Sequence, residues 1–270
     1  MSIVSYEVIY RGIFQRLLAN KISRTFVLAA VKDGKQGISF GRYSDSPERN
    51  GIPCKLFGYI ADTKEELEEV AAQYEPKQVN VTICVDDTLT KGIESWGWYG
   101  LQPLNALTKP GGTIVMTSTQ SAEDLAKHIH RRDTPYNISL IKSEPSFAGL
   151  WVYKDDGTDA RCLGAALKAC PDICSMASLA IAIRENVGGD EHVETARASY
   201  EDARSVEIKS GEGETETPFT FEKPGWEDMR LGVVIDAVGG HFKYGDSDGG
   251  YVPGRNEYFK KWSTRSMRPV

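Results

Sequence analysis

Short apolar runs alternate with helical patterns along the first half of the chain. Residues 11–32 place apolar side chains at the three- and four-residue spacing of one helix face. Residues 79–85 form an unbroken apolar and β-branched run, which is typical of a strand buried on both faces. Further strands are predicted at residues 7–10, 36–40, 54–60, 113–117 and 137–141, and further helices at residues 63–73 and 122–130. Pro110-Gly111-Gly112 predicts a tight turn that leads into the strand at residues 113–117. This alternation predicts an α/β fold with a mainly parallel, twisted sheet and helices on both faces.

The second half of the chain is patterned differently. Helices are predicted at residues 162–169, 175–186 and 192–206. From Lys209 onward the periodicity gives way to acidic, glycine-rich and then aromatic sequence, which favours a linker and an extended, irregular C-terminal arm. We therefore expect an α/β domain at residues 1–208 and a linker with its arm at residues 209–270.

Composition and charge narrow the class of protein. The chain has 270 residues, of which 40% are hydrophobic and 26% charged, as in ordinary globular proteins. The 32 Lys and Arg residues against 38 Asp and Glu leave a net charge of -6, which argues against nucleic acid as a partner. No apolar run approaches the ~18–20 residues that cross a bilayer, so no membrane partner is expected. Five scattered cysteines without an export signal predict reduced thiols and a cytoplasmic location.

The cysteines and histidines do not predict a metal site. Cys170 and Cys174 are separated by three residues, whereas the ligands of iron–sulfur and zinc sites are usually separated by two. Two further cysteines fall inside predicted strands, where they are expected to be small core residues. His128 and His130 are two residues apart on a predicted helix, so they point to different faces.

The turn after the first strand lies where many α/β proteins bind phosphate. Its residues are Gly12, Ile13, Phe14, Gln15 and Arg16. A single glycine followed by bulky side chains does not let a pyrophosphate approach the backbone closely, so nucleotide binding is not expected here. A nicotinamide-dependent dehydrogenase is disfavoured for the same reason, because the second and third glycines of its fingerprint are missing.

The loop at residues 41–51 carries an unusual density of polar and charged side chains between two predicted core strands. Open α/β sheets place ligands at strand ends, so this loop is a candidate functional or subunit-contact segment. A purely solvated connection is the equal alternative. The candidate residues are Arg42, Tyr43, Ser44, Asp45, Glu48, Arg49 and Asn50.

Short motifs follow one another along the chain. They are Gly12 with Gln15, Asp33-Gly34-Lys35, residues 46–51, Lys109-Pro110-Gly111-Gly112, Leu163-Gly164-Ala165, and Glu194 with Ala196. Over about residues 3–205 their order resembles the gamma module of the 2-oxoacid:ferredoxin oxidoreductase family. Three later motifs, at residues 218–220, 223–226 and 262–270, resemble the extended arm that begins the same family's delta module.

The resemblance implies a subunit rather than a complete enzyme. In this family thiamine diphosphate and Mg²⁺ lie on partner alpha and beta subunits, and 4Fe–4S clusters pass electrons to ferredoxin. We therefore expect no catalytic residue, no metal and no bound cofactor in this chain. The clusters belong, by the same resemblance, to a ferredoxin-like segment that follows the arm, supplied by a continuation of this chain or by a partner.

One departure from the family pattern bears on the substrate. The family's first turn is usually glycine-rich and its gamma module handles coenzyme A, whereas Ile13, Phe14 and Arg16 replace glycines here. Oxalate oxidoreductase is a member of this family that needs no coenzyme A. It splits oxalate into two CO2, so no acyl group remains for coenzyme A to accept. We therefore expect a fused gamma–delta subunit of an oxalate oxidoreductase. The alternatives are a subunit of a pyruvate or other 2-oxoacid:ferredoxin oxidoreductase that uses coenzyme A, and a ligand-binding α/β module without a redox role.

Two arginines of the polar loop are the side chains of this chain most suited to face such a substrate. Arg42 and Arg49 offer bidentate contacts to a carboxylate, and a dicarboxylate that enters a buried site needs positive charge. The alternative is that both arginines pair with Asp45 or Glu48 of the same loop.

Overall fold

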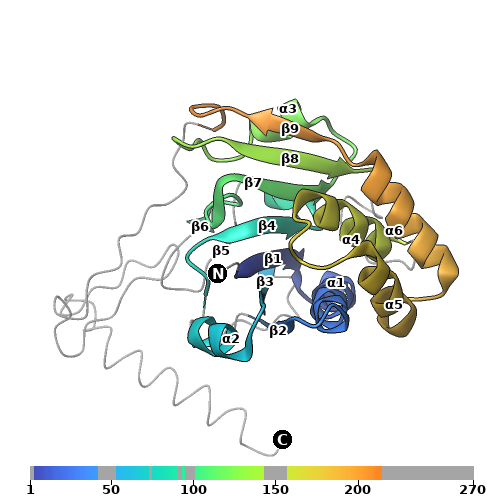
Figure 1. Cartoon of the computed structure of the whole chain (residues 1–270). Coiled ribbons are helices and arrows are strands. Elements are labelled where there is room, and N and C mark those ends of the chain that lie inside the picture. The colour runs from blue at the N-terminus through green and yellow to red at the C-terminus, as the bar shows by residue number, and fades with distance from the viewer. Residues whose placement is uncertain are drawn as a thin grey trace, which may run out of the picture. The chain divides into compact units, whose positions relative to one another are not determined.

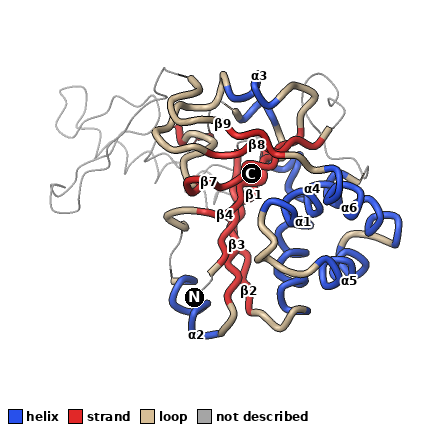
Figure 2. Tube along the Cα trace, turned by 45° about the horizontal axis from the view of Figure 1, so that its top comes forward, coloured by secondary structure: helices blue, strands red, loops and turns tan. Residues whose placement is uncertain are grey.

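A twisted sheet of seven strands runs through the described part of the chain (Figures 1 and 2). In this computed structural model the described residues are 3–41, 53–72, 75–90, 93–94, 101–142 and 157–214. The strands are β1 (Val4–Arg11), β2 (Gln36–Gly41), β3 (Pro53–Ala61), β4 (Val79–Cys84), β7 (Thr108–Thr117), β8 (Tyr136–Ile141) and β9 (Ser205–Ile208), in the spatial order β2-β3-β1-β4-β7-β8-β9. The neighbours β1–β4, β4–β7 and β7–β8 are parallel, and β2–β3, β3–β1 and β8–β9 are antiparallel. The predicted α/β class is confirmed, with the antiparallel pairs at the two edges.

Helices cover both faces of this sheet. They are α1 (Gly12–Lys32), α2 (Lys64–Ala71), α3 (Ala122–Ala126), α4 (Thr158–Ala169), α5 (Met176–Asn186) and α6 (Asp190–Asp202). One face is covered by α1, α4, α5 and α6, which form a layer beside the sheet in Figure 2. The opposite face packs against α3 and a 3₁₀ turn, η2 (Asp87–Leu89). Two short strands, β5 (Ile93–Glu94) and β6 (Leu101–Gln102), form a separate pair.

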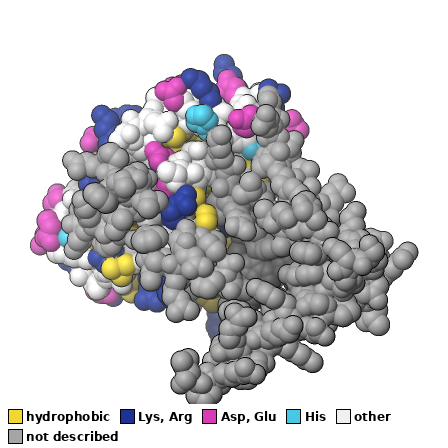
Figure 3. Space-filling model, turned by 180° about the vertical axis from the view of Figure 1, so that it is seen from behind, with side chains coloured by type: hydrophobic (Ala, Val, Ile, Leu, Met, Phe, Trp, Pro, Cys, Tyr) yellow, Lys and Arg dark blue, Asp and Glu magenta, His cyan; other side chains and the backbone are white. Residues whose placement is uncertain are grey.

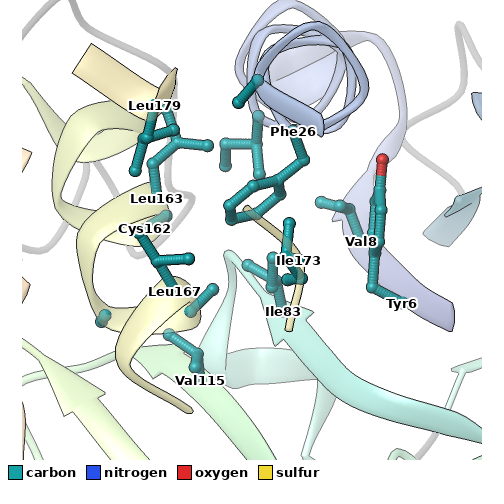
Figure 4. Packing of buried hydrophobic residues seen from close by; sticks show 14 of the residues in the cluster. Tyr6, Val8, Phe26, Ile83, Val115, Cys162, Leu163, Leu167, Ile173 and Leu179 are labelled. Carbon is teal, nitrogen blue, oxygen red and sulfur yellow. The ribbon is translucent and has the colours of Figure 1, made fainter. Parts of the chain in front are cut away.

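The main hydrophobic core lies between the sheet and the layer of four helices (Figure 4). Along β7, Val115 faces this core whereas Ile114 and Met116 face the α3 side, which is the two-residue alternation of a strand. Phe26 of α1 and Leu163 of α4 are both completely buried in this cluster. Burial of each such side chain contributes about 1.5–3 kcal/mol.

Helices α4 and α6 cross closely at a glycine. A Cβ atom on Gly164 would overlap the carbonyl oxygen of Ala196 and lie 3.0 Å from the amide nitrogen of Tyr200. The missing side chain therefore lets the two helix backbones approach each other. Gly164 and Ala196 are both among the motif residues noted in the sequence.

The ends of α1 and α5 are joined by one aspartate. Asp33, directly after α1, accepts hydrogen bonds from the backbone and hydroxyl of Ser175 and from the hydroxyl of Ser178. Ser175 is the N-cap of α5, so the same residue begins one helix and holds the end of another. Partial burial of Asp33 opposes its ionisation, but the hydrogen bonds from Ser178 and Ser175 outweigh it and hold the pKa of Asp33 below its usual range.

A buried ion pair lies on the α3 side of the sheet. Lys55 Nζ of β3 donates to Glu7 Oε2 of β1 at 2.8 Å, and both side chains are completely buried. Thr82 of β4 donates to Glu7 Oε1 at 2.8 Å, and the Thr82 and Thr108 hydroxyls are hydrogen-bonded at 2.8 Å. The polar contacts thus connect β3, β1, β4 and β7, and the charged groups are paired as burial requires.

The structure corrects the predicted turn at Pro110-Gly111-Gly112. These residues lie inside β7, which begins at Thr108, and the pairing of β4 with β7 shifts between Val79 and Val81. Gly111 has a φ of 72°, a left-handed value that favours glycine. The glycines therefore form a bulge within a strand and not a turn before one.

Two predicted helices are too long. The helix expected at residues 192–206 ends at Asp202, and Val206 and Ile208 alternate as strand residues of β9, which pairs with β8. The helix expected at residues 122–130 ends at Ala126, after which His128 N donates to the carbonyl of Leu125 at 3.0 Å. Such a three-residue closure tightens the chain and ends the α-helix.

The chain divides into two compact units. The first comprises Met1–Ile93 with Pro103–Pro218, and the second Glu94–Gln102 with Phe219–Val270. The expected division at residues 208 and 209 stays a prediction, because residues 215–270 of the arm lie outside the described residues.

The described surface carries charges of both signs. Figure 3 shows Lys and Arg side chains interspersed with Asp and Glu at the top of the molecule. Lys127 and Asp124 form one such exposed pair, with Nζ and Oδ1 2.6 Å apart. Among the residues that the structure describes, no helix has the length and apolar character that crossing a bilayer demands.

Substitution of Gly164 by alanine should separate α4 from α6, because the new methyl group overlaps the Ala196 carbonyl. We expect Gly164→Ala to lower the free energy of unfolding by about 1–3 kcal/mol in urea titrations of the full chain. Gly37→Ala is the matched control, since its Cβ would find only ordinary contacts of 3.4 Å or more. Equal stability of Gly164→Ala and wild type would contradict the close crossing.

Candidate functional site

The parallel strands β1 and β4 lie at the point where the chain order of the sheet reverses. After β1 the chain passes through α1 to β2 and β3 on one side, and after β4 it continues to β7 and β8 on the other side. In open α/β sheets, ligands bind outside the carboxyl ends of the strands at such a switch point. The carboxyl ends of β1 and β4 therefore define the candidate site.

A glycine makes the abrupt turn from β1 into α1. Gly12 follows the last residue of β1 and is the first of α1, with a φ of 46°. This left-handed conformation is strained for residues with a side chain. The backbone N–H of Arg11 donates to Gln15 Oε1 at 2.7 Å, so a side chain from the first turn of α1 reaches back to the strand.

The Asp86 carboxylate, just after β4, is the centre of the site. Its Oδ2 accepts from Gln15 Nε2 at 2.9 Å and from Arg11 Nε at 3.3 Å. Its Oδ1 accepts from the backbone N–H of Thr88 at 3.0 Å and from the Thr88 hydroxyl at 2.5 Å. The Asp86 side chain is 2% exposed and that of Arg11 is 24% exposed. Strand, helix and following turn are thus held together by one buried negative charge.

Arg11 closes the outer side of this cluster. Besides its contact with Asp86, its Nη2 donates to the Thr88 hydroxyl at 2.8 Å. The guanidinium therefore lies between a carboxylate and a hydroxyl, and its charge is balanced locally.

The polar edge continues to β7. Ser118, directly after β7, donates from its hydroxyl to Asp87 Oδ2 at 2.6 Å, and the same hydroxyl accepts from Gln120 N at 3.0 Å. The backbone N–H of Ser118 donates to the carbonyl of Ile141 at the end of β8. Hydrogen-bonding groups therefore follow the carboxyl edge of the sheet from β1 to β8.

The structure places two of the five predicted turn residues in this cluster. Gly12 makes the turn, and Gln15 is buried and hydrogen-bonded to Asp86, whereas Arg16 is exposed. Ile13 and Phe14 belong to α1, but their side chains lie outside the description. The remodelling of this turn for a different ligand stays a prediction.

The polar loop falls outside the described residues, but its two ends are visible. The predicted residues Arg42, Tyr43, Ser44, Asp45, Glu48, Arg49 and Asn50 all lie in the gap between β2 and β3. Pro53, where the chain re-enters, pairs with Arg11 in the β1–β3 register. The loop therefore returns to the sheet beside the candidate site, while the roles of its residues stay predictions.

The site residues that the sequence prediction missed are Arg11, Asp86, Asp87, Thr88 and Ser118. The signal was present, because Asp86-Asp87 and Ser118 each follow a strongly apolar strand directly. Polar residues at the carboxyl ends of adjacent parallel strands are brought to one edge of the sheet.

The cysteines are placed as structural residues. Cys54 is partly buried and the other four are buried, and all five are free thiols. Burial raises the pKa of Cys170 to about 11 and that of Cys174 to about 12, so both stay protonated near neutral pH. Within the described ranges no group of three His, Cys, Asp or Glu side chains could hold a metal ion.

Comparison with known proteins finds a shared fold. No family model matches the chain. The pyruvate oxidoreductase subunit PORC from Thermotoga maritima superposes with a TM-score of 0.51 at 15% identity, covering 76% of this chain and 99% of that one. The keto/oxoacid ferredoxin oxidoreductase gamma subunit from Geobacter sulfurreducens gives 0.48 at 15% identity, covering 74% and 94%. The 2-oxoglutarate:ferredoxin oxidoreductase from Magnetococcus marinus, with 2-oxoglutarate, coenzyme A and succinyl-CoA bound, gives 0.40 at 10% identity, covering 74% and 30%.

Replacement of Gln15 tests whether the hydrogen bonds that join β1, α1 and Asp86 stabilise the fold. Gln15→Leu removes the acceptor of Arg11 N and a donor to Asp86, both of them at buried or partly buried positions. We expect a loss of about 1–3 kcal/mol in the free energy of unfolding, measured by urea titration of the full chain. Asn20→Leu is the control from the same helix, because its amide donates to the Arg16 carbonyl at the surface. If both variants have the same free energy of unfolding, the hydrogen bonds of Gln15 contribute no more stability than a surface contact.

Proposed function

We propose that the chain is a gamma-type subunit of a 2-oxoacid:ferredoxin oxidoreductase complex. Alpha and beta subunits are its partners, and ferredoxin accepts the electrons. Thiamine diphosphate with Mg²⁺ supplies the decarboxylation chemistry on those partners, and 4Fe–4S clusters carry the electrons. This chain contributes an α/β scaffold and the candidate site at the carboxyl ends of β1 and β4.

The fold shared with the Thermotoga subunit over nearly that protein's full length supports this proposal. Fold alone does not assign function, so the sequence motifs have to agree with it. The agreement is that Gly12 and Gln15, the first motif of the family resemblance, lie together at the switch point of the sheet. That coincidence of a motif with the site favoured by topology is the observation that carries the proposal.

Five other motif residues, all in the described part of the chain, have structural roles. Gly164 and Ala196 make the close crossing of α4 and α6, and Gly111 and Gly112 form the bulge in β7. Asp33 joins α1 to α5. The contacts of these residues hold the fold together and involve no ligand, which leaves the strand ends as the place for ligand chemistry.

Oxalate is the substrate that we propose for the complex. Its oxidation to two CO2 releases two electrons and leaves no acyl group, so the complex needs no acceptor such as coenzyme A. The hydrogen bonds around Asp86 support this choice. The donors of the turn are already bonded to an internal carboxylate, so they are not offered to coenzyme A. A pyruvate or other 2-oxoacid oxidoreductase that uses coenzyme A, and a ligand-binding module without a redox role, are the competing proposals.

Native purification followed by activity measurement separates these proposals. We expect the chain to travel with large thiamine-dependent partners, and the complex to reduce ferredoxin with oxalate in the absence of coenzyme A. Coenzyme-A-dependent oxidation of pyruvate without oxalate activity would replace the oxalate assignment by its first alternative. Purification of the chain without such partners would favour the binding module.

The loop arginines are tested in the same complex. Arg42→Ala and Arg49→Ala should raise the KM for oxalate if these guanidinium groups bind the incoming dicarboxylate. Arg24→Ala, at an exposed position of α1, is the control of equal charge change. Kinetics unchanged from wild type in both loop variants would remove the arginines from the substrate path.

A further inference from the structure

The donors around Asp86 are of the kind that α/β proteins use to bind an anion from solution. They are a guanidinium from Arg11, a side-chain amide from Gln15, and a backbone N–H and hydroxyl from Thr88. They converge next to the N-terminal end of α1, where the helix dipole adds positive potential. Four donors, from the end of β1, the first turn of α1 and the turn after β4, therefore meet on a single carboxylate.

We propose that Asp86 is an internal anion that closes this turn to phosphate- and carboxylate-bearing ligands. Its two oxygens occupy the position that the oxygens of a ligand would take, and its side chain is 2% exposed, so the place is filled. Asp86 thereby determines which ligands the switch point rejects. This inference rests on the geometry of the described residues and not on the proposed oxidoreductase role.

Charge and shape both contribute to this exclusion. An entering phosphate would meet a like charge at the centre of the site, and in a partly buried place that repulsion is only weakly screened. Phosphate would also have to compete for donors that are already bonded. Without the Asp86 side chain, the same donors would be left pointing at an unoccupied position, which favours binding of a small anion.

Asp87 provides a matched control. It is the next residue and also carries a carboxylate, but it accepts from the Ser118 hydroxyl instead of from Arg11 and Gln15. Removing its side chain changes the net charge and the chain flexibility in the same way. It leaves the donors around Asp86 occupied.

The experiment compares the full chain as wild type, Asp86→Gly and Asp87→Gly. Melting temperature and titration calorimetry are followed with inorganic phosphate and with acetate, against chloride at equal ionic strength. We expect Asp86→Gly to bind phosphate at least about tenfold more tightly than wild type and Asp87→Gly. A second substitution, Arg11→Met, should abolish that gain, because the guanidinium is the only full positive charge among the four donor groups.

Several results would overturn the inference. Phosphate binding by the wild type that Arg11→Met removes would mean that Asp86 does not close the turn. Folded Asp86→Gly protein that gains no more anion affinity than Asp87→Gly would mean that the donors do not form an anion site. If the glycine variant does not fold, Asp86→Ala takes its place with Asp87→Ala as its control, because alanine also removes the carboxylate and leaves the position of its oxygens empty. The same gain and the same dependence on Arg11 are then expected, and their absence would be equally decisive.

Discussion

The Asp86 carboxylate imposes the constraint on which the switch-point end of the sheet depends. A nearly buried negative charge has to be surrounded by donors, and here they come from β1, from α1 and from the turn after β4. Arg11 has to end its strand beside β4, and Gln15 has to lie one helical turn inside α1. Gly12 is the residue that reconciles these demands, because its positive φ turns the chain directly from strand into helix.

The position of α1 then determines much of the main core. Phe26 lies on this helix, and its burial against the sheet requires that the helix axis be held in place from its first residue. The far end is held by Asp33, which accepts hydrogen bonds from Ser175 and Ser178 at the start of α5. The helix is thus held at both ends by aspartates, one at the site edge and one at the opposite end. Between the two ends, burial of apolar side chains stabilises the helix on the sheet, and the hydrogen bonds at the ends fix its position.

The buried pair of Glu7 and Lys55 defines the sheet in a similar way. Taking both charges out of water is unfavourable, and a well-packed apolar pair would often be as stable. A one-residue slip of β3 against β1 would point Lys55 to the other face and leave the buried Glu7 carboxylate without its cation. We interpret the pair, with its extension to Thr82 and Thr108, as a device that specifies strand register rather than as a source of stability.

Sequence patterning predicted the elements that are regular and strongly apolar. The run of β4 and the helical spacing of α1 each reflect a single physical demand, burial, and both predictions are confirmed. The pattern of apolar residues failed to predict elements where backbone geometry or strand pairing, and not burial, decides the structure. The glycines at residues 111 and 112 were expected to form a turn, but they form a bulge inside β7, where Gly111 has a left-handed φ and a Cβ on Gly112 would crowd the Asn80 carbonyl. The strand β9 was missed because its four residues follow a helix of similar polarity, and only pairing with β8 distinguishes it.

The candidate site was predicted in part for the same reason. Gly12 was noted for its place after a strand and Gln15 for the motif of the family resemblance, but the role of Asp86 depends on β4 lying next to β1. Once its carboxylate fills the turn, the glycine and the helix terminus no longer indicate a ligand there, although their spacing alone resembles a binding turn. Specific ligand chemistry at this edge then has to come from other segments that meet it. The loop that carries Arg42 and Arg49 returns to the sheet at Pro53, directly opposite Arg11. Under our proposal that Arg42 and Arg49 bind an anionic substrate, selection among such substrates depends on this loop and not on the turn that Asp86 fills.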